Sequence, residues 1–115
     1  MSAFVISQKE NLQYKFTFEH RRGKTLITSV EYPSKEIVLH TISYLQASFK
    51  DFTFLNFKTP SGKFYFKVSL EGSIFATSRK YTTELRQEKT KEEILRSFET
   101  AEVLDFSENI FFDIP

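Results

Sequence analysis

The chain has 115 residues, a formal net charge of +1 and no cysteine, so it fits one domain and excludes disulfides, thiolate catalysis and sulfur-bound zinc. The balance of charges gives no sign of a nucleic-acid-binding tail, and no segment is long and apolar enough to cross a membrane. Fourteen Phe and five Tyr, with only three Gly and three Pro, favour a sheet with compact turns.

A strand pattern followed by a glycine turn occurs twice along the chain. In the first half, aromatic residues from Tyr14 to Phe18 alternate with polar ones, and Gly23 precedes the sequence Thr28-Ser29-Val30-Glu31-Tyr32. In the second half, apolar residues alternate from Phe64 to Leu70, and Gly72 precedes the sequence Thr77-Ser78-Arg79-Lys80-Tyr81. Alternation puts one face of each strand on a core, and each glycine suits a hairpin turn. The two patterns predict a duplication, with a one-residue difference in the hairpin loop.

A helix is expected after each of these patterns, because the apolar spacing changes there from two to about 3.6 residues. Ser34 is the predicted cap of the first helix. Thr90 is the predicted cap of the second, with Glu93 completing a capping box, so that Thr82 to Lys89 becomes an insert that forms a surface loop or an extra turn. Apolar segments, Phe52 to Phe57 and Ile110 to Ile114, follow the two helices.

These elements predict a single duplicated domain over residues 1–115, with repeat one at 1–51 and repeat two at 52–115. A unit of about 50 residues buries too little apolar surface to be stable alone, so both units share one core. The expected fold is α+β, with one sheet and two helices on one of its faces. Phe16, Phe18, Phe64 and Phe66 are predicted core residues.

The aromatic hairpin, the Thr-Ser-x-x-Tyr sequence after it and the helix containing Ile42-x-x-Leu45 resemble the YegP-like family of small domains. The resemblance extends over nearly the whole chain, twice. It implies tandem β-β-β-α repeats in one largely antiparallel sheet, with terminal strands exchanged between repeats. It implies no activity, because none is established for the family.

The two Thr-Ser-x-x-Tyr sequences supply the candidate site residues, namely Thr28, Ser29, Tyr32, Thr77, Ser78 and Tyr81. Their hydroxyls are suited to lining a pocket for a small ligand. They are also suited to anchoring the turn from strand to helix by bonding to backbone groups. We favour turn anchoring, because equivalent positions in a duplicated fold share the same folding constraints.

The sequence predicts no enzyme, no cofactor and no metal. It contains two histidines, His20 and His40, and neither has the neighbours that a catalytic triad or a metal site needs. Nucleic acid is not an expected partner, because residues 97–115 carry no Lys or Arg and contain five acidic residues. A membrane is not expected either, and the expected location is cytoplasmic.

Apolar residues occupy both phases of Phe52 to Phe57, so the sheet face away from the helices also carries apolar side chains. Leu55, Phe57 and Tyr65 form a candidate interaction surface there, for another protein or a second copy of the chain. The alternative is that long neighbours such as Lys67 screen this face. The sequence therefore predicts a non-catalytic binding or interaction module. A second hypothesis is binding of single-stranded nucleic acid or a small ligand on the sheet face.

Overall fold

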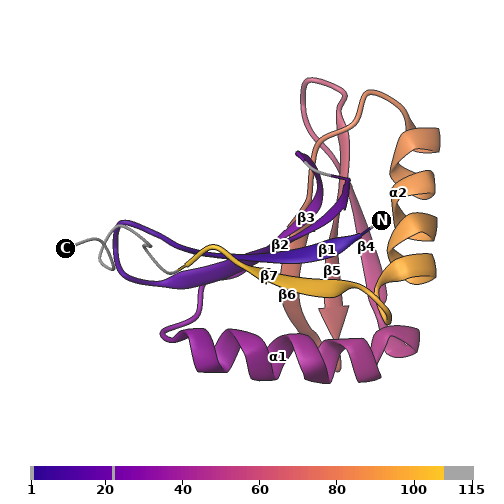
Figure 1. The fold of residues 1–115 in the computed structure, drawn as a ribbon. Coiled ribbons are helices and arrows are strands. Elements are labelled where there is room, and N and C mark those ends of the chain that lie inside the picture. Colours follow the sequence, from indigo (N-terminus) through magenta and orange to yellow (C-terminus); the bar gives the residue numbers. More distant parts are fainter. Residues whose placement is uncertain (1, 22, 108–115) are drawn as a thin grey trace.

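The fold is one seven-stranded sheet with two helices, seen in a computed structural model that describes residues 2–21 and 23–107 (Figure 1). The sheet order is β4-β5-β6-β3-β2-β1-β7. In chain order the elements are β1 Ala3–Gln8, β2 Tyr14–Arg21, β3 Lys24–Ser29, α1 Lys35–Ala47, the 3-10 turn η1 Phe49–Asp51, β4 Thr53–Lys58, β5 Phe64–Leu70, β6 Ser73–Ser78, α2 Glu84–Ser97 and β7 Glu102–Asp105. The expected α+β fold with a largely antiparallel sheet is confirmed.

Each half of the chain forms three antiparallel strands in the same order. Phe4 lies opposite Phe18 in the first half, and Phe54 lies opposite Val68 in the second. The hairpin glycines have positive φ angles, +79° at Gly23 and +83° at Gly72, which a side chain would strain. The alternation in the sequence therefore predicts the strands and their turns correctly. The repeat boundaries at 51 and 52 stay a prediction.

The two halves meet along β3 and β6, which pair antiparallel at the centre of the sheet. β1 and β4 each pair with the next strand of their own half. Among the strands of residues 2–21 and 23–107, β7 alone crosses to the other half, where it runs parallel to β1 with Ala3 opposite Glu102. The strand exchange implied by the family resemblance thus takes the form of one crossing strand.

A single core lies between the helices and one face of the sheet. Phe16, Phe18 and Phe66 are fully buried, as predicted, whereas Phe64 is half-buried near the end of the sheet. Phe98, just after α2, packs its ring 4.8 Å from that of Phe4 and 5.0 Å from those of Phe18 and Phe52. Since Phe98 contacts aromatic rings from residues on both sides of the predicted repeat boundary, the halves share this core.

The first helix begins as predicted, because the Ser34 hydroxyl accepts a hydrogen bond from the Ile37 N–H at 3.2 Å. The predicted start of the second helix is wrong. Its cap is Thr83, whose hydroxyl accepts from the Arg86 N–H at 3.2 Å. Thr90 lies inside α2, where its hydroxyl donates to the Arg86 carbonyl at 2.9 Å. Residues 84–89 therefore belong to the helix, and the predicted insert does not exist.

A strand that the sequence did not predict, β7, follows α2. Gln46 on α1 helps to place it, since its side-chain amide lies within 3.0 to 3.2 Å of the carbonyls of Phe98, Glu99 and Ala101. The predicted apolar segment from Ile110 to Ile114 lies outside the described residues.

Candidate binding surface

The sheet face away from the helices, which we call the open face, carries one continuous row of residues across all seven strands. In sheet order the row is Leu55, Lys67, Thr77, Thr28, Thr17, Val5 and Leu104. Its middle is made of threonines and its two ends are apolar. Side chains alternate between the two faces of a strand, so the buried phenylalanines lie on the opposite face. The two described helices pack against that opposite face and leave this row uncovered.

The β4 end of the open face holds an aromatic pair. The rings of Phe57 and Tyr65 are stacked, with centroids 5.2 Å apart and planes at 18°. The Lys67 ammonium lies 5.6 Å from the centre of the Phe57 ring. Leu55 and Phe57 remain 37% and 40% exposed. The predicted surface residues Leu55, Phe57 and Tyr65 thus lie together on the open face, at the edge strand.

The β7 end of the open face forms a second apolar area that the sequence analysis missed. Val5, Leu104 and Phe106 line a shallow hollow there, and Phe106 is 65% exposed. Glu19 and Glu102 lie beside it, on either side of Ala3. A signal was present in the sequence, because Leu104 and Phe106 alternate with polar neighbours, but the segment is too short for its periodicity to decide.

The six residues of the Thr-Ser-x-x-Tyr sequences lie in three separate places. Thr28 and Thr77 face each other across β3 and β6 on the open face. Ser29 and Ser78 are buried on the opposite face, where their hydroxyls bond to the backbone. Tyr32 pairs with Tyr14 at the start of β2, and Tyr81 pairs with Phe64 at the start of β5. Hence the structure brings the threonines together but does not gather all six side chains around one ligand.

Tyr32 and Tyr81 lie in different surroundings. Burial raises the pKa of Tyr32, so its hydroxyl stays protonated well above neutral pH. Tyr81, in contrast, lines a hollow beside α2 together with several basic side chains. The hydroxyls of the two motifs therefore have different environments.

The two histidines have different surroundings. The Nδ1 atom of His20 lies 3.0 Å from Glu93 Oε2 on α2, and His40 is exposed on α1. Within residues 2–21 and 23–107, no group of three or more His, Asp or Glu side chains is placed to hold a metal ion. Among the described helices, none is long and apolar enough to span a membrane.

The comparisons with known proteins concern the fold. A solution NMR structure of UPF0339 protein SO3888 from Shewanella oneidensis is similar to this chain with a TM-score of 0.80 and 19% identity, covering 92% of each chain. The NMR structure of the protein of unknown function yegP from E. coli gives 0.76 and 20% identity, covering 94% of this chain and 95% of that one. The chain has a YegP-like fold.

The YegP-like fold confirms the α+β architecture with a largely antiparallel sheet that the resemblance implied, and the tandem repeats stay a prediction. Family models do not match the chain, and a search of curated proteins finds no match either. Because yegP is itself described as a protein of unknown function, the likeness brings no activity with it. Function therefore has to be argued from the surfaces of this chain.

Proposed function

We propose that the protein is a non-catalytic interaction module whose partner is a second copy of the same chain, bound through the open face. The observation that carries this proposal is the exposed cluster of Leu55, Phe57 and Tyr65 on a sheet face that neither of the two described helices covers. Exposed aromatic and aliphatic side chains grouped on one face are typical of protein contacts. A cytoplasmic location belongs to the same proposal, since the chain contains no cysteine.

Charge along the open face favours a second copy over an unrelated protein. Lys67 lies at the β4 end, and the hollow at the β7 end is lined by Glu19, Glu102 and Arg21, an excess of one negative charge. Consider a twofold dimer in which the two open faces pack against each other with their strand orders reversed. The β4 end of each copy, with Lys67, then lies on the β7 end of the other, with Glu19 and Glu102. Each apolar end then also meets an apolar end, so the face is complementary to itself.

The experiment measures the oligomeric state by analytical ultracentrifugation. We expect a concentration-dependent dimer for the wild type and a monomer for Leu55→Glu, because a charge at the centre of an apolar contact opposes burial. Leu85→Glu is the matched control, since Leu85 is 65% exposed on α2, outside the open face, and this variant keeps the dimer. Circular dichroism verifies that both variants are folded. A wild type that stays monomeric at the highest soluble concentration overturns the proposal.

Single-stranded nucleic acid is the second candidate for the open face. The stacked rings of Phe57 and Tyr65, with the Lys67 ammonium above Phe57, offer the aromatic and cationic groups that base stacking uses. Glu19 and Glu102 on the same face oppose phosphate. Fluorescence anisotropy of a labelled oligonucleotide tests this function, with Tyr65→Ala expected to weaken binding if the bases stack on this pair.

A further inference from the structure

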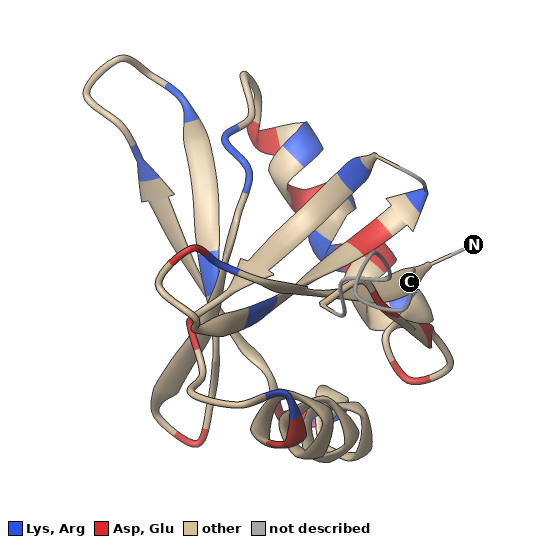
Figure 2. Cartoon of the chain, turned by 60° about the vertical axis from the view of Figure 1, so that its left-hand side comes forward, with Lys and Arg blue, Asp and Glu red and all other residues tan. Residues whose placement is uncertain are grey.

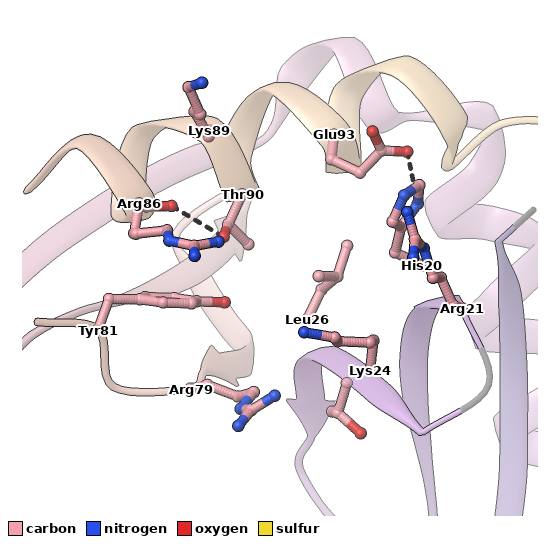
Figure 3. A pocket seen from close by; sticks show the side chains of 11 residues that line it. His20, Arg21, Lys24, Leu26, Arg79, Tyr81, Arg86, Lys89, Thr90 and Glu93 are labelled. Atoms are coloured by element: carbon pink, nitrogen blue, oxygen red, sulfur yellow. Dashed lines mark hydrogen bonds and ion pairs between the residues drawn. The ribbon is translucent and has the colours of Figure 1, made fainter. Parts of the chain in front are cut away.

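A second candidate site lies between the tip of the β2–β3 hairpin and α2 (Figure 3), and it shares Arg21 with the hollow at the β7 end of the open face. It is an open hollow of about 310 Å³. Five basic side chains line it from separate parts of the chain, namely Arg21, Lys24, Arg79, Arg86 and Lys89. Figure 2 shows the basic residues at both strand ends of this hairpin. Figure 3 shows the Arg86 guanidinium beside the ring of Tyr81 and the Lys24 ammonium pointing across the hollow toward the Tyr81 hydroxyl, whereas Lys89 points outward.

The positive charge in this hollow is not balanced by the protein. Glu93 is the one acidic residue among those that line it. Its carboxylate already contacts His20 at 3.0 Å and Arg96 at 2.5 Å. Within the described part of the chain, none of the five basic side chains forms an ion pair. Converging like charges repel one another, and a bound anion relieves that repulsion.

The duplicated fold provides an internal comparison for these residues. The backbone N–H of Arg86 donates to the cap of α2, and the backbone N–H of Ile37 donates in the same way to the cap of α1. Arg86 and Ile37 therefore occupy equivalent positions. Arg79 follows the buried Ser78, and Val30 follows Ser29. Since the equivalent positions are apolar, neither arginine is required by the fold.

The two hairpin tips differ in the same way. The strand β2 ends at Arg21, whereas the equivalent residue after β5 is Glu71, which accepts a hydrogen bond from the Tyr44 hydroxyl on α1. The contact between α1 and the β5–β6 hairpin is therefore closed by a hydrogen bond from a neutral hydroxyl to a carboxylate. The contact between α2 and the β2–β3 hairpin presents several cations around an open space, which is the arrangement that a ligand site needs and a purely structural contact does not.

From this geometry we infer that the hollow binds a small soluble ligand carrying a diphosphate or triphosphate group. Arginine guanidinium groups match phosphate oxygens with paired hydrogen bonds, and lysines add charge without that geometric demand. Four cations around the hollow, Arg21, Lys24, Arg79 and Arg86, are more than one orthophosphate neutralises, so a chain of phosphates fits them better. The volume is at the low end of small-molecule pockets, which favours a compact polyphosphate over a long polymer.

The test uses inorganic triphosphate, diphosphate and orthophosphate as probes, titrated by calorimetry at constant ionic strength. We expect triphosphate to bind the wild type at least about tenfold more tightly than orthophosphate. The double variant Arg79→Gln/Arg86→Gln is expected to lose about tenfold or more of the triphosphate affinity. Both arginines are exposed, and circular dichroism verifies that the variant folds.

The matched control is Lys15→Gln/Lys50→Gln, which removes the same charge from positions that do not line the hollow. It is expected to bind triphosphate within about twofold of the wild type. Equal losses in both double variants mean attraction by net charge only and overturn the inference. No binding of triphosphate, or a preference for orthophosphate, overturns it as well. Tighter binding of a single-stranded RNA oligonucleotide than of triphosphate assigns the hollow to a polymer instead and rejects the small ligand.

Discussion

Ser29 and Ser78 make the same pair of hydrogen bonds in the two halves of the sheet. The Ser29 hydroxyl accepts from the Phe16 N–H at 2.9 Å and donates to the Val30 carbonyl at 2.7 Å. The Ser78 hydroxyl accepts from the Phe66 N–H at 2.9 Å and donates to the Arg79 carbonyl at 2.7 Å. Each serine thus satisfies a buried backbone donor at the point where its strand leaves its neighbour.

Replacing these serines tests turn anchoring against ligand binding. Ser29→Ala and Ser78→Ala are each expected to lower the free energy of unfolding by about 0.5 to 2 kcal/mol, because a buried N–H loses its acceptor. Denaturant melts measure the loss, and Ser43→Ala, exposed on α1, is the control with little change. If the double variant instead kept its melting temperature and lost a shift caused by a metabolite, the serines would be ligand contacts.

Phe66 is the core residue best suited to a stability measurement, because it is fully buried and its ring lies 5.3 Å from that of Phe54. Phe66→Ala is expected to cost about 3 to 5 kcal/mol of unfolding free energy. Phe57→Ala removes the same side chain from the exposed open face and is expected to cost much less. A loss below about 1 kcal/mol for Phe66→Ala would contradict its place in the core.

Asp105 is expected to make stability depend on acid pH. Partial burial acts to raise the pKa of Asp105, but hydrogen bonds from Ser107 and the Lys35 ammonium at 3.1 Å outweigh it and hold the pKa below 3.8. A carboxyl with a lowered pKa in the folded state stabilises above its unfolded pKa, and this contribution is lost as pH falls through the folded value.

The variant Asp105→Asn tests that sign. It is expected to unfold more easily than wild type near pH 7, by less than about 1 kcal/mol because the pair is partly exposed. The difference should close as pH falls through the lowered pKa of folded Asp105, where the wild-type carboxyl also becomes neutral. Urea melts at both acidities measure it, with Glu92→Gln, exposed on α2, as the charge control. A difference that persists in acid would mean that Asp105 acts through its shape and not through its charge.

The proposal of one duplicated domain predicts that neither half folds alone. Phe4 and Phe18 pack against Phe98, so a fragment of residues 1–51 loses the cover of its core. We expect that fragment to give the narrow NMR dispersion of an unfolded chain, and to gain dispersion when residues 52–115 are added. A well-dispersed spectrum of the isolated fragment would show that the repeats are independent domains.

The hairpins were predictable because their buried side chains alternate cleanly and their turns contain glycine. The start of α2 was not, because its buried face includes Gln87 and Thr90. Gln87 satisfies its side chain by donating to the Tyr65 carbonyl at 2.8 Å, and Thr90 bonds within the helix. Polar residues with such internal partners break the apolar spacing that marks a helix in a sequence. The same loss of signal made Thr90 resemble a cap.

The two candidate surfaces also differed in how far the sequence could predict them. Leu55, Phe57 and Tyr65 could be placed on one face from alternation alone, and the register of β4 and β5 puts them there. The basic hollow could not be predicted, because its residues come from segments more than 50 positions apart and meet only when α2 packs beside the first hairpin. A comparison of the two repeats position by position does contain a hint, since arginines stand where the other half has apolar residues.

The pairing of β7 with β1 sets the order in which a newly made chain can finish folding. Ala3 pairs with Glu102, which is synthesised almost a whole chain length later, and Phe98 is synthesised just before Glu102. While the ribosome still holds the second half, the outer edge of β1 and the rings of Phe4 and Phe18 have no final cover. Exposed edges and apolar rings of this kind bind chaperones and other nascent chains. Synthesis of residues 98–105 is therefore the step that closes both the sheet edge and the core.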